Sequence, residues 1–297
     1  MTETTISTLK TTAVGAPLQL TPPTTRRARR HAGVILSVAV LALLCAAALL
    51  ADVLSPHRPE AINLRVRLTA PLTLPEHPLG TDATGRDILS RILHGGRVSL
   101  MVGLLATAVG LALGTLLGII SGYFRGWTDE IIMYLVDVQF ALPFVLLAVA
   151  VALVLGRSLA VLIGLAALST WSLYARVIRG EVLSLREREF VIAARSLGAG
   201  DAYIMFHHLL PNLAGPLLVL GTLSIGRIIL LESGLSFLGI GIQPPTPSWG
   251  GMINEGRDYL SSAWWLSTLP GIVLMILVLV IGNLGDWLRD RLDVKVM

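Results

Sequence analysis

The side chains in this sequence that could do chemistry are few and scattered. None of its six histidines stands four residues from another, the helical spacing at which two imidazoles share a metal ion. His207 and His208 are adjacent, so on a helix they point about 100° apart. The sequence also has no nucleophile elbow, no carboxylate pair and no phosphate-binding loop ending in Lys-Ser or Lys-Thr. We therefore predict a chain that is not an enzyme, holds no metal ion or cofactor, and does not itself bind ATP in the usual way.

Three ionisable residues fall inside or at the border of strongly apolar segments. They are Asp137, Arg227 and Glu232. Such residues are costly inside a membrane and usually face a cavity or a partner. Arg227 and Glu232 are five residues apart, which is a poor spacing for pairing on one helix face. Two interpretations stay open, because each residue could pair with another helix or sister subunit, or could line a polar path.

A short polar stretch, residues 189–212, interrupts the apolar segments in the second half of the chain. Residues 187–197 have the apolar spacing of a helix, and the glycines that follow suit its end. Asp201 is a good cap for a second short helix over residues 202–209, and Pro211 suits the first turn of the next apolar helix.

The expected product is a helix, a sharp turn and a second helix that lies across the axes of the apolar helices. We expect it to present Tyr203, Ile204, Phe206 and His207 to solvent. Exposed apolar side chains on a short helix indicate a docking surface. A plain connecting loop is the alternative.

The segments that must position these residues have the composition of membrane-spanning segments. Hydrophobic residues make up 54% of the chain and charged residues only 14%, against about 25% in a soluble domain. Charge-free runs close to the roughly 20 residues of a spanning helix recur at residues 32–51, 98–124, 138–156, 158–175, 209–226 and 259–285. Backbone groups in lipid must be satisfied within the element, so these runs predict an all-α polytopic protein with six transmembrane helices.

Charge fixes the expected orientation. Residues 1–30 form a Thr- and Pro-rich tail that ends in four arginines, and we expect it to be disordered and cytoplasmic. A net charge of +4 is explained by this orientation, so no nucleic-acid partner is predicted. The layout that follows is a first helix at residues 31–54, an external loop with interfacial helices at residues 55–97, and five further helices in residues 98–297, with both termini cytoplasmic.

The polar stretch resembles a loop of a known protein family. Ala193-Ala194, then Gly198, then Leu210-Pro211 is similar to the EAA loop of binding-protein-dependent ABC importer permeases. The resemblance implies a cytoplasmic coupling loop over residues 180–212 that fits a groove on a separate ATPase. The residues it assigns to ATPase coupling are Ala193, Ala194, Gly198, Ala199, Asp201, Tyr203, Ile204, Phe206, His207, Leu210 and Pro211. Ile192 stands where the loop's acidic residue would be, so no acidic contact to the ATPase is carried over.

Other motifs resemble the dipeptide/oligopeptide/nickel branch of that family, as its C-type subunit. They are His77-Pro78-Leu79-Gly80-Thr81-Asp82, Gly85-Arg86-Asp87, Ser90-Arg91, Asp137 with Pro143, Leu235-Ser236-Phe237-Leu238-Gly239, the stretch from Pro244 to Gly250, and the one from Gly285 to Asp293. Arg227 departs from the pattern, since a small residue is usual there. It could meet the carboxylate of a peptide near the external mouth.

The resemblance implies a function in the bacterial inner membrane. The chain would be half of the translocation pathway of an ATP-driven importer of di- or oligopeptides, with nickel, haem or glutathione as alternative cargoes. Its implied partners are a homologous permease, two ATP-binding subunits that hold ATP and Mg²⁺, an external substrate-binding protein and membrane lipid. A secondary transporter and a membrane-embedded enzyme are the rival classes, but neither inverted repeats nor a catalytic cluster is visible.

Overall fold

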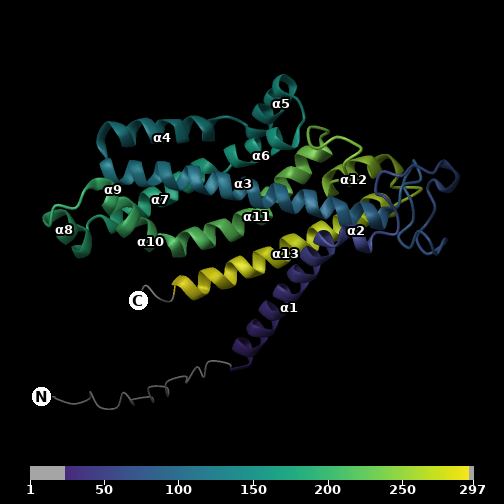
Figure 1. Ribbon diagram of the computed structural model, residues 1–297, viewed down its shortest axis with the longest axis horizontal. Helices are drawn as coiled ribbons and strands as arrows, with labels where there is room; N and C mark the ends of the chain where they lie inside the picture. Colours follow the sequence, from purple (N-terminus) through teal and green to yellow (C-terminus); the bar gives the residue numbers. More distant parts are fainter. Residues whose placement is uncertain (1–23, 294–297) are drawn as a thin grey trace, which may run out of the picture.

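The computed structural model describes the backbone of residues 24–293 and the side chains of residues 33–292. Every regular element in this part of the chain is a helix, which confirms the predicted all-α class (Figure 1). The α-helices are α1 (Thr24–Leu49), α2 (Ala51–Leu54), α3 (Ile88–Phe124), α4 (Gly126–Ala141), α5 (Phe144–Leu155), α6 (Leu159–Leu168), α7 (Trp171–Leu185), α8 (Glu189–Ser196), α9 (Asp201–Tyr203), α10 (Leu210–Asn212), α11 (Ala214–Phe237), α12 (Trp249–Gly256) and α13 (Trp265–Asp293). Three short helices of other types are η1 (Leu64–Val66), η2 (Ile204–Leu209) and η3 (Arg257–Tyr259).

Four helical stretches are long and apolar enough to cross a membrane. They are Ile88–Phe124, Leu159–Leu185, Ala214–Phe237 and Trp265–Leu292. The bent pair of α4 and α5 makes a fifth if it counts as one span. The apolar part of α1, Gly33–Leu49, is shorter. By length and composition four or five spans qualify among the described residues, so the predicted number of six is not confirmed.

The third predicted span, residues 138–156, is not one helix. The chain bends by 91° between α4 and α5. The break lies at Leu142 and Pro143, where Leu142 has extended backbone angles and Pro143 caps α5. A proline disfavours helical angles in the residue before it and has no N–H to donate, so a helix ends at this dipeptide.

Several predicted boundaries also shift. Residues 24–30 of the predicted disordered tail are helical and belong to α1, whereas residues 1–23 lie outside the described part of the chain. The predicted external loop loses its last residues to α3, and the single 3-10 turn η1 stands in place of the interfacial helices expected there. α7 runs on to Leu185, so the predicted coupling loop 180–212 begins inside this helix.

The centre of the bundle is α3, which packs most extensively against α7 (Figure 1). Four glycines spaced four residues apart, at positions 110, 114, 118 and 122, line this contact. A methyl group added to Gly114 would come within 2.5 Å of the Trp171 carbonyl oxygen, and one added to Gly118 within 2.7 Å of the Ala175 carbonyl oxygen. Glycine is therefore required for the two backbones to lie this close, as in other membrane helix pairs.

The bundle has two distinct ends (Figure 1). One end carries α8, α9 and α10, and the C-terminal end of α13 lies toward it. The opposite end carries α2, α12 and the irregular segment of residues 55–87 that precedes α3. The N-terminal part of α1 points away from that second end, so both ends of the described chain lie toward the α8–α10 side.

Candidate functional site

The polar stretch between α7 and α11 folds as a helix, a turn and a second helical segment, as predicted. α8 ends where Gly198 takes a φ of 83°, a left-handed conformation that glycine adopts without strain. The Ala199 N–H donates to the Ala194 carbonyl at 3.0 Å and closes the turn. From Asp201 to Asn212 the chain is helical again, passing through α9, the π-helix η2 and α10. We call residues 189–212 the connector.

Asp201 is not the cap that the sequence predicts. Gly200 occupies the cap position of α9, and Asp201 is the first residue of the helix. Its carboxylate instead accepts a hydrogen bond of 2.6 Å from the Tyr123 hydroxyl at the end of α3. The Arg195 guanidinium lies over the Tyr123 ring, 5.3 Å from its centre. One tyrosine of α3 thus ties both halves of the connector to the bundle.

Apolar packing makes this attachment extensive. Four connector and adjoining residues, Val191, Ile204, Leu209 and Leu213, are buried against Ile119, Tyr123, Ile178 and Val182 of α3 and α7. Burying an aliphatic side chain contributes roughly 1.5–3 kcal/mol in water. The connector is therefore packed onto the ends of α3 and α7 and is not a free loop.

The outer face of the connector differs in one residue from the prediction. Tyr203 and Phe206 are 51% and 54% exposed, and His207 is exposed with its ring stacked on Tyr203 at 4.3 Å. Ile204 has no exposed surface, so its predicted place on the docking surface is wrong. η2 is a π-helix, whose hydrogen bonds join residues five apart, and Ile204 and Leu209 both point inward.

The remaining predicted coupling residues surround this face. Ala193, Gly198 and Pro211 are exposed, and Ala194, Ala199 and Leu210 are partly buried. An apolar groove of about 510 Å³ between α3 and α11 reaches Phe206 and Leu210. The connector therefore offers an aromatic and apolar face at one end of the bundle.

Asp137, Arg227 and Glu232 do not come together. Asp137 is exposed on α4 and pairs with Arg176 of α7, whose guanidinium also lies over the Phe140 ring. Arg227 is exposed on α11 and makes no ion pair with any described residue. Asp137 thus fits the pairing interpretation, whereas Arg227 remains available to a partner or a cargo.

Glu232 has no exposed surface at all. The Ser236 hydroxyl donates to its carboxyl group at 2.7 Å, the Ser99 hydroxyl at 3.2 Å and the Ser233 hydroxyl at 3.5 Å. Since Ser99 belongs to α3, this group joins α11 to α3. Burial within a single chain cannot be undone by adding subunits, so the structure does not place Glu232 on the wall of a path.

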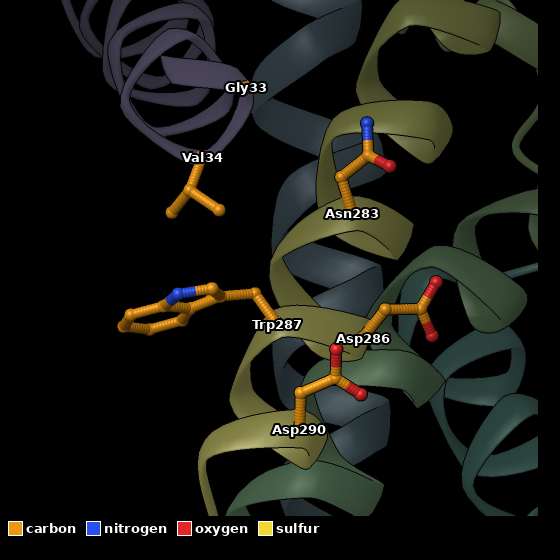
Figure 2. Close-up of a pocket in the computed structure, with 6 residues that line it drawn as sticks. All are labelled: Gly33, Val34, Asn283, Asp286, Trp287 and Asp290. Carbon is orange, nitrogen blue, oxygen red and sulfur yellow. The ribbon is translucent and has the colours of Figure 1, made fainter. Parts of the chain in front are cut away.

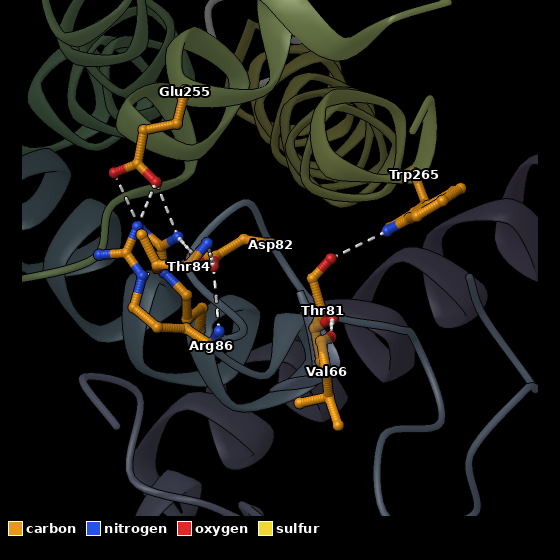
Figure 3. Close-up of polar contacts among 8 residues, drawn as sticks. Val66, Thr81, Asp82, Thr84, Arg86, Glu255 and Trp265 are labelled. Atoms are coloured by element: carbon orange, nitrogen blue, oxygen red, sulfur yellow. Dashed lines mark hydrogen bonds and ion pairs between the residues drawn. The ribbon is translucent and has the colours of Figure 1, made fainter. Parts of the chain in front are cut away.

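The opposite end of the bundle contains an ionic cluster that the sequence reading missed (Figure 3). Arg91 donates to Asp82 at 2.5 Å and to Glu255 at 2.7 and 3.0 Å. Arg86 bonds the same two carboxylates at 2.6 and 2.8 Å. Asp82 and Arg91 are almost fully buried. The motifs around Asp82 and Arg91 marked this region, but nothing pointed to Glu255, which lies 164 residues from Arg91.

Asp82 is held in its charged form by this cluster. Burial would raise the pKa of Asp82, but the Arg91 charge, the Arg86 backbone N–H and the Thr84 hydroxyl outweigh it and hold the pKa below the ordinary value of 3.8. A carboxyl group whose pKa is lowered by folding stabilises the fold above its ordinary pKa and loses this contribution as the pH falls through the folded value. The cluster is therefore intact at neutral pH.

Replacing Asp82 by asparagine should be strongly destabilising. Without Asp82 the two guanidinium groups share Glu255 as their single carboxylate in the cluster. Removing one partner from a buried ion pair costs about 3–5 kcal/mol. The matched control is Asp52→Asn, because Asp52 also bonds an arginine, Arg97 at 2.7 Å, but its side chain is 71% exposed. Thermal unfolding in detergent should show a large loss for Asp82→Asn and little change for Asp52→Asn. Equal effects of the two changes would contradict this account of the cluster.

A separate pocket of about 280 Å³ lies between α1 and α13 (Figure 2). Gly33 and Val34 line it from α1, and Asn283, Asp286, Trp287 and Asp290 line it from α13. The Trp287 ring reaches under Val34 while the two aspartates project from the same helix. The pocket contains none of the residues predicted as functional.

The sequence of this chain is similar to that of a known protein family and to individual relatives. The sequence profile described as "binding-protein-dependent transport system inner membrane component" matches residues 114–297. The chain is 40% identical to the dipeptide transport system permease protein DppC of Alkalihalophilus pseudofirmus, over 84% of this chain and 81% of that protein. It is 41% identical to the glutathione transport system permease protein GsiD of Pectobacterium atrosepticum, over 90% and 88% respectively.

A solved structure shares the fold. The inward-facing MetNI methionine ABC transporter has a chain that superposes with a TM-score of 0.56 at 18% identity, covering 68% of this chain and 95% of that one. At this identity the likeness concerns the fold alone.

Proposed function

Because the chain belongs to the family of binding-protein-dependent transport system inner membrane components, we propose that it forms half of the translocation pathway of an ATP-driven peptide importer. Membership places it in the bacterial inner membrane as a multi-pass protein. In this proposal the chain has no catalytic role, and a separate pair of ATPase subunits binds ATP and Mg²⁺.

The observation that carries the proposal is the connector. It is packed onto the ends of α3 and α7 and presents Tyr203, Phe206 and His207 outward. Aromatic side chains are enriched at the centres of protein interfaces. We infer that this face docks in a groove of the ATPase, as the EAA-loop resemblance implies.

The packing also supplies a way to transmit movement. Tyr123 bonds Asp201, and the buried residues of the connector contact both α3 and α7. A displacement of the connector must therefore move the ends of these two helices with it. ATP binding that closes the ATPases would shift the population between outward- and inward-facing states, because each state binds the closed motor differently.

The arrangement of the ends supports cytoplasmic termini. The start of α1, the end of α13 and the connector all lie toward one end of the bundle (Figure 1). If the connector meets a cytoplasmic ATPase, both ends of the described chain share that side. We count α1 with α2 as the first span and the bent pair α4–α5 as the third, which gives six crossings.

Two cargo classes follow from the relatives. The DppC proteins of A. pseudofirmus and Pseudomonas aeruginosa are dipeptide and di/tripeptide permeases, and the latter is 42% identical over 73% of this chain. The GsiD relative is a glutathione permease of equal similarity. Both cargoes are short peptides with free carboxylates, so we propose a peptide cargo, with glutathione as the second candidate. Nickel and haem, the other cargoes implied by the resemblance, stay predictions from the sequence.

The proposed assembly contains a homologous permease, two ATP-binding subunits and an external substrate-binding protein within membrane lipid. Extraction in mild detergent should co-isolate the ATPase subunits with this chain. Proteoliposomes that hold the whole assembly should accumulate peptide only with a hydrolysis-competent ATPase. Transport by the chain without an ATPase would instead indicate a secondary transporter. The ligand that co-purifies with the external binding protein of this assembly identifies the cargo.

Replacing Arg227 by alanine should lower uptake without lowering assembly. Arg227 is exposed on an apolar helix and makes no ion pair with any described residue. A hydrogen bond between a charged group and a carboxylate contributes about 1.5–3 kcal/mol. We therefore expect uptake at subsaturating peptide to fall roughly tenfold or more. Arg157→Ala, at another exposed arginine, is the control. Unchanged uptake in Arg227→Ala would remove Arg227 from the path.

A further inference from the structure

Three side chains that the proposed transport function does not use meet where the irregular segment of residues 55–87 joins the first turn of α3. They are His57, His77 and Asp87, and one ligand-capable atom of each lies within 4.8 Å of the others. His77 and Asp87 are 5% and 1% exposed, whereas His57 is partly exposed. The group is thus built into the fold but can be reached from solvent at His57.

The three residues are held in place by one serine and one helix end. Asp87 is the N-cap of α3, and its carboxylate accepts from the Ser90 N–H and the Ser90 hydroxyl, both at 2.7 Å. The other carboxylate oxygen lies 2.9 Å from His77 Nδ1. The backbone N–H of His57 donates to the same Ser90 hydroxyl at 3.2 Å, and the two imidazole rings stack with centres 4.5 Å apart. The positions of all three ligand groups are therefore fixed before anything binds.

His57 leaves one polar atom unsatisfied. Its Nδ1 is buried and has no hydrogen-bond partner among the described residues. A buried polar atom without a partner is costly, so such atoms usually mark a site that something else occupies. The atom belongs to the same residue that completes the group of three.

The donor set defines the class of ligand. Imidazole nitrogens suit Zn²⁺ and neighbouring transition metals, whereas Mg²⁺ and Ca²⁺ prefer sites made of oxygen. We propose that His57, His77 and Asp87 bind one divalent transition-metal ion, with Zn²⁺ the best fit and water completing the coordination. The ion takes the place of the direct contact between His77 Nδ1 and the Asp87 carboxylate, and it fastens the irregular segment of residues 55–87 to the start of α3.

Metal content of the purified full chain tests the proposal. The protein is prepared in detergent with an affinity tag that contains no histidine, incubated with Zn²⁺ and separated from excess ion. We expect one bound zinc per chain by elemental analysis and a rise in the thermal unfolding temperature with Zn²⁺. Replacement of Zn²⁺ by Co²⁺ should give the visible absorption bands of a nitrogen- and oxygen-ligated site. Absence of stoichiometric metal and of these bands would overturn the proposal.

Two histidine variants make the test specific. His57→Gln should weaken Zn²⁺ binding at least tenfold and abolish the thermal shift, because it removes a ligand without touching the Asp87 cap. His94→Gln is the control, since His94 bonds the Ser90 carbonyl and Asp52 and lies outside the group of three. Retention of full binding in His57→Gln shows that the three residues are only packed together. If His57→Gln does not fold, the Co²⁺ bands of the unchanged protein alone decide the outcome.

Discussion

Replacing Phe206 by aspartate is expected to abolish both recovery of the ATPase with this chain and ATP-driven uptake. Phe206 is 54% exposed on the outer face of the connector, beside Tyr203. Truncating an aromatic residue at the centre of an interface costs 2 kcal/mol or more, and a buried charge adds to that cost. We therefore expect binding of the ATPase to weaken by a factor of about 30 at least.

The exposure of Phe206 makes this test interpretable, because the change removes little internal packing. The thermal stability of the isolated variant should stay close to that of the unchanged protein. Leu72→Asp is the matched control, since Leu72 is 88% exposed in the segment at the opposite end of the bundle. It should leave co-isolation of the ATPase intact. Normal ATPase recovery and uptake in Phe206→Asp would show that the connector face is not the docking surface.

The second large effect concerns the contact between α3 and α7. Gly114→Ala should destabilise the protein by about 1–3 kcal/mol, the usual cost of adding a methylene or methyl group to a filled core. The new methyl group would lie 2.5 Å from the Trp171 carbonyl oxygen and 2.6 Å from Tyr174 Cβ. Neither atom is the free end of a flexible side chain, so the two helices must move apart.

Gly180→Ala is the control for this change. Gly180 lies in α7, the partner helix, but a methyl group added there meets nothing within 4 Å. Unfolding temperatures in detergent should fall for Gly114→Ala and stay level or rise for Gly180→Ala. Equal behaviour of the two variants would mean that the close approach of the helices does not depend on glycine.

The sequence was sufficient for the class of protein and for the shape of the connector. Long apolar runs predict helices in lipid, because no other element satisfies the backbone there. Gly198 predicts the turn, because its position after an amphipathic helix requires a left-handed residue. These features depend on neighbouring residues alone, which a sequence displays directly.

What the sequence could not supply depends on contacts between distant segments. Ile204 was expected outside because an α-helical pattern was assumed, whereas the π-helix turns it toward α3 and α7. For Glu232 the sequence left open whether it pairs with another helix or lines a path, and Ser99, more than a hundred residues earlier, helps to enclose it. His57 and His77 are twenty residues apart in an irregular segment, so no helical spacing brings them together. Each of these outcomes is decided by tertiary packing.

The ionic cluster at the end of the bundle opposite the connector also sets an order of events in biogenesis. Arg86 and Arg91 leave the ribosome long before Glu255, yet both arginines bond this glutamate in the finished protein. Until the segment that bears Glu255 has been synthesised, these two guanidinium groups share Asp82 as their only carboxylate in the cluster. Closure of this end of the bundle is therefore a late step of assembly, and a nascent chain stalled before α12 carries two guanidinium groups there with a single carboxylate partner.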